Sequence, residues 1–388
     1  MKYDIVVIGA GIQGAGVAQA AAAAGYSVLV VEQTAPAAGT SSKSSKLIHG
    51  GLRYLESGQF GLVHESLRER TLLLKLAPEL VKLQPLHIPI YENSSRSALT
   101  IRAGLSLYAL LAGLNSNSLF RQLSRKEWQG LEGLRQDNLK AVFRYQEAQT
   151  DDAALTRAVL QSAIVLGADV MMPAKFLGAE RNGQCCKVDV EGASGIQSIS
   201  CRVLVNCAGP WVNQVLAKVT PALPLPAIEL VQGSHLLLPP LLDQYFYVEA
   251  PQDKRAVFVL PWEGKLMVGT TEKVHQGAPE QAACSEDEKR YLVATLSHYF
   301  PHLSIPTEVE SFAGLRVLPK SDKTAFSRPR EVMFSVDDEA KPRVLSIMGG
   351  KLTTYRATAA AAMARLMPSL PTKERRADTE LITLIPLD

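Results

Sequence analysis

The sequence has few cysteines, little net charge and no long apolar run. Its five cysteines are odd in number and none stands in a CxxC pair, which disfavours both a disulfide framework and a zinc site. The net charge is only +3, from 41 basic and 38 acidic residues, which is too small to indicate a nucleic-acid-binding protein. We therefore expect a protein of a reducing cytoplasm that binds no nucleic acid, and any anion that it recognises must be bound by a local group of cations.

Apolar segments are too short to cross a membrane. The longest candidate, LSLYALLAGL at residues 105–114, has about half of the roughly 20 residues that a bilayer span requires. Such a segment more commonly forms a helix packed in a core, and contact with a membrane surface is the alternative. The first residues lead directly into an apolar run and glycines, which leaves no room for a signal peptide. We expect a cytoplasmic protein, with peripheral association at the inner face of the membrane as the alternative.

The length of 388 residues and the apolar content of 47% indicate a globular protein of roughly two domains. The segment DIVVIGAGIQGAGVAQAAAAAGYSVLVVE at residues 4–32 predicts a buried strand, a glycine turn, a helix ending near Gly25 and a second strand at 27–31. Gly9, Gly11 and Gly14 match the G-x-G-x-x-G pattern, which binds a pyrophosphate at a helix N-terminus. Glu32 follows at the spacing expected for an acceptor of ribose hydroxyls.

The remaining pattern predicts a nucleotide-binding domain that is interrupted by a β-rich domain. We expect a helix at about 62–83, short strands in LQPLHIPIYENSS at 83–95, and a helix from the N-cap residues Asp151 and Asp152 to about 166. Strands are expected at 167–173 and in CRVLVNCAGPW at 201–211, with further short strands at 225–275. A final strand in RVLSIM leads through two glycines to a helix opening near Thr353.

The stretch SSKSSKLIHGGLRYLE at residues 41–56 combines hydroxyls, three cations and a glycine pair. Its composition suits a phosphate-rich ligand, because the cations and hydroxyls bind phosphate while glycines let the backbone approach closely. A solvated loop has a similar composition. This stretch taken alone does not decide between the two interpretations.

With these residues the sequence resembles the FAD-dependent glycerol-3-phosphate dehydrogenases and oxidases, within the D-amino-acid-oxidase-like flavoproteins. The resemblance runs from residue 4 to about 367 and is carried, in the family's order and at closely similar spacing, by GAGIQGAG, TSSKSSKLIHGGLRYLE, NCAGPWVN, GSHLLLP, VFVLPWEGKLMVGTTE, AGLRVL and GGKLTTYR. It implies an α/β fold, in which a Rossmann-like FAD-binding domain of the glutathione-reductase type is interrupted by a β-rich α+β substrate (cap) domain. We place the FAD-binding domain at 1–80, 150–215 and 310–388, and the substrate domain at 81–149 and 216–309.

The resemblance also assigns residues to FAD and to an anionic substrate. The expected FAD-binding residues are Gly9, Gly11, Gly14, Glu32, Thr40, Ser41, Ser42, Ser45, Leu47, Gly50, Gly51, Ala208, Gly209, Trp211, Gly350, Leu352 and Thr353. The expected substrate-binding residues are Arg53, Tyr54, Arg316, Arg328 and Lys351. Arg316 and Lys351 stand in apolar or glycine-rich runs, where an unpaired charge is costly to bury, and a phosphate ester would supply the missing partner.

Oxidation of a secondary alcohol requires a base for the hydroxyl proton, while the flavin accepts the hydride at N5. Arginine stays protonated, since its pKa lies above about 12, so the arginines bind substrate or stabilise the oxyanion. His49, His235 and Lys351 are the base candidates, of which we rank His49 first. No histidine arrangement indicates a metal.

Three functions remain open from sequence. The first is oxidation of sn-glycerol 3-phosphate to dihydroxyacetone phosphate, with electrons passed to quinone or another acceptor. The second is FAD-dependent oxidation of another small anionic hydroxy acid or amine, and the third is flavin binding without turnover. Two departures lie near the expected substrate side: Glu272 follows GTT where relatives tend to have aspartate, and Pro329 follows Arg328. Relatives also continue into a helical domain, whereas this sequence ends at Asp388, so we expect a short form without it.

Overall fold

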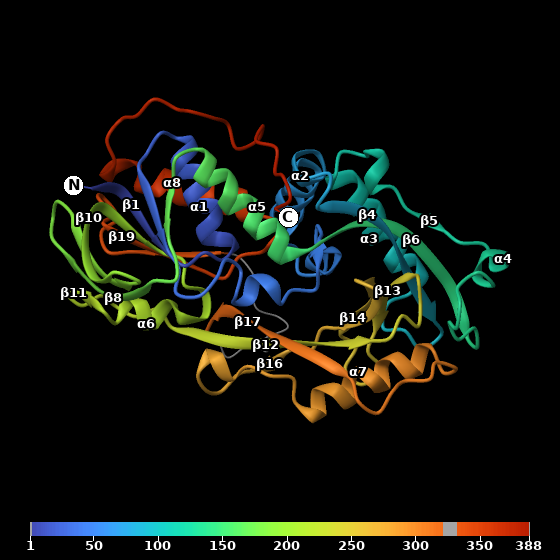
Figure 1. Ribbon diagram of the computed structural model, residues 1–388. Coiled ribbons are helices and arrows are strands. Elements are labelled where there is room, and N and C mark those ends of the chain that lie inside the picture. Colours follow the sequence, from blue (N-terminus) through green and yellow to red (C-terminus); the bar gives the residue numbers. More distant parts are fainter. Residues whose placement is uncertain (1, 321–331, 388) are drawn as a thin grey trace.

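The computed structural model describes residues 2–320 and 332–387, and in this part of the chain two sheets form the framework (Figure 1). The first sheet has the strand order β11-β8-β9-β10-β1-β2-β7, and β19 joins it between β10 and β18. Its members are β1 (Tyr3–Ile8), β2 (Val28–Val31), β7 (Asp169–Met171), β8 (Lys175–Arg181), β9 (Cys186–Gly192), β10 (Gly195–Asn206), β11 (Val219–Thr220), β18 (Met333–Val336) and β19 (Val344–Met348).

The centre of the first sheet is parallel, as expected for a nucleotide-binding domain. Strand β1 runs parallel to β2 and β10, and β10 runs parallel to β19. Helices α1 (Ile12–Ala23), α5 (Asp152–Val165) and α8 (Tyr355–Leu366) lie together on one face of this sheet (Figure 1). The alanine-rich surface of α1 is buried there, and its small side chains let the helices approach closely.

The second sheet has the strand order β16-β12-β15-β14-β13-β4-β6-β3, with β17 beside β12 and β5 beside β6. Its members are β3 (Leu47–Ile48), β4 (Val81–Tyr91), β5 (Arg121–Gln122), β6 (Leu139–Thr150), β12 (Ile228–Leu238), β13 (Tyr245–Glu249), β14 (Ala256–Trp262), β15 (Lys265–Gly269), β16 (Lys273–Val274) and β17 (Glu310–Pro319). Side chains alternate between two apolar cores, one with α2 (Phe60–Leu76) and α3 (Ala98–Leu111), the other with α4 (Arg125–Trp128) and α7 (Glu286–Tyr299). The short α6 (Val212–Leu216) follows β10.

The α/β class is confirmed, and most expected elements are present with shifted ends. The expected helix at 62–83 is α2, which ends at Leu76 because Pro78 has no N–H to donate. The expected short strands after it form one strand, β4, which includes Pro85 and Pro89. Helix α5 begins as predicted, since Asp151 caps it by accepting from the backbone N–H groups of Ala153 and Ala154.

The chain passes between the two sheets several times. Strands β1 and β2 belong to the first sheet, β3–β6 to the second, β7–β11 to the first, β12–β17 to the second, and β18 and β19 to the first. The expected domain boundaries stay a prediction, although β3 and β17 pair within the second sheet and not within the first. Among the described residues, no helix is long and apolar enough to cross a membrane.

Candidate active site

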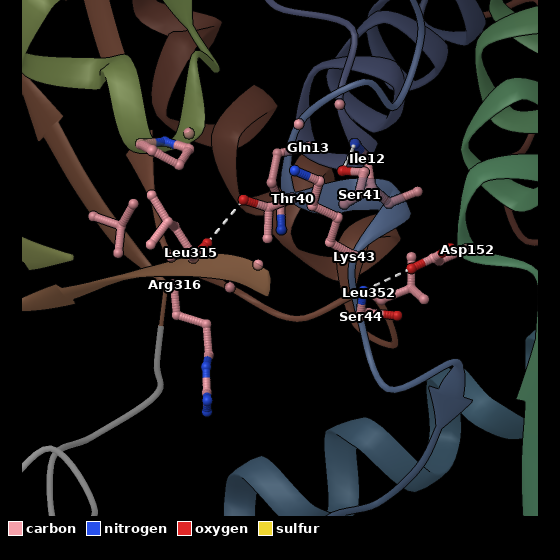
Figure 2. Close-up of a pocket in the computed structure, with 18 of the residues that line it drawn as sticks. Ile12, Gln13, Thr40, Ser41, Lys43, Ser44, Asp152, Leu315, Arg316 and Leu352 are labelled. Atoms are coloured by element: carbon pink, nitrogen blue, oxygen red, sulfur yellow. Dashed lines mark hydrogen bonds between the residues drawn. The ribbon is translucent and has the colours of Figure 1, made fainter. Parts of the chain in front are cut away.

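A cavity of about 1040 Å³ is lined by residues of both sheets and of the segments that connect them. Figure 2 shows part of its wall, where the first turn of α1, the serine-rich segment (residues 41–46) and β17 come together. The expected FAD-binding residues that line it are Gly9, Gly11, Glu32, Thr40, Ser41, Ser45, Leu47, Gly51, Ala208, Gly209, Trp211, Gly350, Leu352 and Thr353. Residues from five separate parts of the sequence, at 9–11, 32, 40–51, 208–211 and 350–353, therefore meet at one surface.

The glycine turn before α1 forms one end of the cavity. Gly9 has φ +100°, a left-handed conformation, and a Cβ atom there would lie 2.7 Å from the carbonyl oxygen of Cys207. Gly14 does not line the cavity, because it packs α1 on the turn: its Cβ atom would lie 1.9 Å from the carbonyl oxygen of Gly9. The N-terminus of α1 thus faces a space suited to a phosphate group.

Glu32 and Ser41 fix the geometry of this end. The Glu32 carboxylate accepts from the backbone N–H of Ala10 at 2.8 Å and of Thr34 at 2.9 Å. Ser41 Oγ accepts from the N–H of Ile12 at 2.9 Å, which holds the serine-rich segment against the first turn of α1 (Figure 2). Both side chains are therefore oriented before any ligand binds.

The serine-rich segment is anchored by a buried ion pair between Lys46 and Asp152. Sequence reasoning missed this pair. Lys46 Nζ donates to Asp152 Oδ1 at 2.6 Å and to the carbonyl oxygen of Ser42 at 2.8 Å. The other carboxylate oxygen of Asp152 accepts from the N–H of Ser44 at 2.9 Å (Figure 2). Ser42 does not line the cavity, and its position is fixed by the hydrogen bond from Lys46. The ion pair of Lys46 and Asp152, with its hydrogen bonds to Ser42 and Ser44, is called the clasp below. The sequence showed Asp152 only as helix-capping chemistry, and no spacing linked it to Lys46.

The glycine pair has two different roles. Gly51 lines the cavity with φ +78°, whereas Gly50 lies behind it and its N–H donates to the hydroxyl of Tyr108 at 2.9 Å. That hydroxyl donates to Glu147, which pairs with Arg70 at 2.7 Å in a fully buried network. Burial and the adjacent Glu147 raise the pKa of Tyr108, so the phenol stays protonated. The network holds the cavity wall from the side of α2 and α3.

Three of the expected substrate-binding cations line the cavity: Arg53, Arg316 and Lys351. Lys351 Nζ donates to Ser66 Oγ at 3.2 Å and lies 4.0 Å from the ring centroid of Tyr54, which also lines the cavity. The cavity wall thus carries three of the four expected cations, and Tyr54 lies beside Lys351.

Two further charged residues, Glu272 and Arg255, modify the expected set of substrate-binding residues. Arg316 Nη2 donates to the carbonyl oxygen of Thr271, and its Nη1 lies 3.7 Å from the carboxylate of Glu272, whose side chain is 4% exposed. Arg255 also lines the cavity and donates to the backbone oxygen of Glu272 at 2.8 Å. Sequence reasoning missed Arg255, because it stands outside every recognised motif. Arg328 lies outside the described residues.

The two candidate histidines have different surroundings. His49 lines the cavity, and its backbone N–H donates to Thr353 Oγ1 at 3.2 Å. His235 also lines the cavity but is buried; it stacks on Phe312 at 4.8 Å between ring centroids and bonds Ser45 Oγ through Nε2 at 2.9 Å. Burial, and next Arg316 and Lys46, lower the pKa of His235 to about 3. A histidine with this pKa is a poor proton acceptor near neutrality, so His49 remains the first-ranked base, and its role stays a prediction.

The segment before α8 completes the wall. Gly349 and Gly350 have φ of +72° and +82°, and a Cβ atom on Gly350 would lie 2.6 Å from Nε2 of Gln13. Leu352 and Thr353 line the cavity, and α8 begins at Tyr355, two residues after the expected Thr353. The backbone at Gly350 therefore lies close to the first turn of α1.

Residues 4–367 match the model of the FAD dependent oxidoreductase (DAO) family. The chain belongs to this family. The resemblance inferred from the motifs is therefore confirmed, as are the oxidoreductase class and the dependence on FAD. The glycines that no side chain can replace, the exposed N-terminus of α1 and the oriented Glu32 fit a dinucleotide held extended across the cavity.

Named relatives span nearly the whole chain. A glycerol-3-phosphate dehydrogenase of Pseudomonas aeruginosa is 38% identical over 94% of this chain and 72% of its own. A D-erythritol 1-phosphate dehydrogenase of Brucella abortus is 35% identical over 95% of this chain and 74% of its own. The crystal structure of the glycerol-3-phosphate dehydrogenase of Bacillus halodurans, complexed with FAD, has a TM-score of 0.76 and 27% identity, and the match covers 99% of this chain and 68% of that one.

Proposed function

We propose that this protein oxidises sn-glycerol 3-phosphate to dihydroxyacetone phosphate, with FAD as the hydride acceptor and a quinone as the subsequent electron acceptor. The observation that carries the proposal is the convergence of Arg53, Arg316 and Lys351 on the cavity that also contains the dinucleotide fingerprint. A phosphate monoester carries roughly −1.5 to −2 charges near neutrality. Several cations lining one cavity suit such a group better than they suit a single carboxylate.

The residues of the chain have distinct parts in this reaction. Arg316 and Lys351 bind the phosphate, and Arg53 orients the substrate or stabilises the developing oxyanion, because guanidinium groups cannot act as bases. His49 takes the hydroxyl proton of the substrate. Bound FAD supplies the two-electron oxidation by accepting the hydride. The buried clasp of Lys46 and Asp152 keeps the serine-rich segment, and with it the wall of the cavity, in place.

The test is anaerobic mixing of the purified, flavin-loaded protein with sn-glycerol 3-phosphate, followed by the visible absorbance of the flavin. Rapid bleaching is the expected result. D-Erythritol 1-phosphate is the comparison substrate, since it shares the phosphate group and the Brucella relative acts on it by name. If dithionite bleaches the flavin but sn-glycerol 3-phosphate does not, the proposed substrate is wrong. Bleaching by hydroxy acids or amines alone would support the second function considered from sequence.

Peripheral association with a membrane is part of the proposal, and the outer face of α3 supports it. Ile101, Leu105 and Tyr108 of this helix are buried, whereas Leu99 and Leu110 on the opposite face are 76% and 60% exposed. An exposed apolar helix face suits an interfacial contact. Co-sedimentation with anionic lipid vesicles should decrease in Leu99→Glu and Leu110→Glu variants and remain unchanged in Leu381→Glu, which alters an exposed leucine far along the chain.

A further inference from the structure

A second cavity, of about 330 Å³, lies beside the strands that carry the first one. Its lining includes two aromatic side chains, Tyr245 and Trp262, together with Leu242, Gln149 and Lys265. The mixture of flat rings and a few polar groups is typical of small-ligand sites. Nothing in the proposed alcohol oxidation uses these residues.

The two cavities share one face of the second sheet. Successive side chains of a strand point to opposite faces, so residues two apart lie on the same side. On β6, Glu147 lines the first cavity and Gln149 the second. On β13, Tyr247 lines the first and Tyr245 the second. The floor of the cofactor cavity therefore continues along the strands into the second cavity.

The serine-rich segment is the wall between them. Ser45 and Leu47 line the cofactor cavity, whereas the Nζ atom of Lys46 lies 5.4 Å from the ring centroid of Trp262, which lines the second cavity. Leu47 is also the cross-strand partner of Gln149. Paired residues of the neighbouring strands β3 and β6 thus line the two cavities at this point.

We infer that the second cavity binds the head group of the quinone that reoxidises the flavin. This inference rests on the proposed function and adds the location of its acceptor site. The Trp262 ring offers a stacking surface for a planar ring. The Gln149 amide has two N–H donors, of which one is directed at the carbonyl oxygen of Pro261. The Lys265 ammonium has three, of which one is directed at the Glu310 carboxylate at 2.6 Å. These donors suit the two carbonyl oxygens of a quinone.

The transfer balances without a further reactant. With FAD and a quinone held in the two cavities, two electrons would pass from reduced flavin to quinone. The two protons that the reduced flavin loses would go to solvent, and the quinone would take up two protons from solvent and become a quinol. The ion pair of Lys46 and Asp152 lies beside Trp262, at the wall between the donor cavity and the proposed acceptor cavity.

The test separates the two half-reactions in a Trp262→Leu variant, with a short-chain, water-soluble benzoquinone as the probe. Photoreduced enzyme is mixed anaerobically with this quinone or with phenazine methosulfate, and the return of flavin absorbance is followed. We expect at least a tenfold slower reoxidation by the quinone, with unchanged reoxidation by the dye. Trp262→Phe, which keeps an aromatic ring, should retain most of the rate. Phe60→Leu, which alters an exposed aromatic residue outside both cavities, is the matched control.

A binding measurement provides the second readout. Quinone added to oxidised wild-type enzyme should quench tryptophan fluorescence with saturation, and the saturable part should be absent in Trp262→Leu. Wild-type reoxidation and wild-type quenching in this variant would overturn the inference, as would equal slowing with both acceptors. Because the enzyme is photoreduced, these results do not depend on the alcohol substrate. Failure of sn-glycerol 3-phosphate to bleach the flavin would instead refute the proposed substrate.

Discussion

Removal of the Arg70 guanidinium should destabilise the protein strongly. The side chains of Arg70 and Glu147 are only 1% and 2% exposed, and their closest atoms are 2.7 Å apart. Arg70→Met would leave a buried carboxylate without its ionic partner, a change that typically costs about 3–5 kcal/mol. Arg70 also donates to Ser118 Oγ at 2.8 Å and to the carbonyl oxygen of Gln146 at 3.0 Å, so further buried acceptors would lose a donor.

Urea denaturation of the flavin-loaded protein, followed by tryptophan fluorescence, measures this loss. Glu147→Leu in the Arg70→Met background should restore part of it, because the uncompensated charge is removed together with its partner. Arg121→Met is the control: Arg121 pairs with Glu127 at 2.6 Å, but its side chain is 51% exposed, and such pairs contribute little. If Arg70→Met lowers the free energy of unfolding by less than about 1 kcal/mol, the buried network does not stabilise the fold as we argue.

Three further predictions concern the cofactor, the substrate and pH. Gly14→Ala should abolish FAD retention, since the added Cβ would lie 1.9 Å from the carbonyl oxygen of Gly9; the flavin absorbance per protein measures it, and normal retention would refute the packing role. Arg316→Met should raise KM for the phosphate substrate about 10- to 100-fold through the loss of a charged hydrogen bond of about 1.5–3 kcal/mol, whereas Arg121→Met should leave steady-state kinetics unchanged. The pKa of His235 is lowered from 6.5 to about 3, so the unfolded state binds more protons between these values, and stability should fall as pH decreases through this window. Between pH 7 and pH 5 the urea midpoint of His235→Gln should therefore fall less than that of the wild-type protein. An equal fall in both proteins would contradict the assignment.

The sequence predicted elements best where local chemistry decides them. The helix capped by Asp151 and the strand and turn around Gly9 follow from hydrogen bonding and backbone conformation within a few residues. The end of α2 at Leu76 was misplaced, although Pro78 carried the signal for it. Local sequence could not predict that the next apolar runs join into one strand. This strand, β4, is held by pairing with β6 on one side and with β13 on the other.

The residues of the candidate site also differ in whether local sequence identifies them. Motif residues such as Gly11 and Lys351 were found because the resemblance names them, and the structure brings them to one cavity. The pair of Lys46 and Asp152 was missed because it depends on the contact between segments 106 residues apart. Arg255 was missed because it stands outside every recognised motif and reaches the cavity through the fold of β14 and the segment around Glu272. The burial that lowers the pKa of His235 is likewise a property of the assembled sheets, and no sequence spacing reports it.

The strand order of the first sheet has a consequence for how the protein is made. Strand β1 pairs with β10, and β10 pairs with β19, so the central strands come from residues 3–8, 195–206 and 344–348. During synthesis, the first βαβ unit must wait for most of the chain before its neighbours exist. Such non-local pairing slows folding and exposes unpaired strand edges in the interval. A ribosome-bound chain that lacks the last 50 or so residues should therefore be an aggregation-prone species without a cofactor, and free FAD would begin to protect it only after β19 and the glycines behind it have emerged.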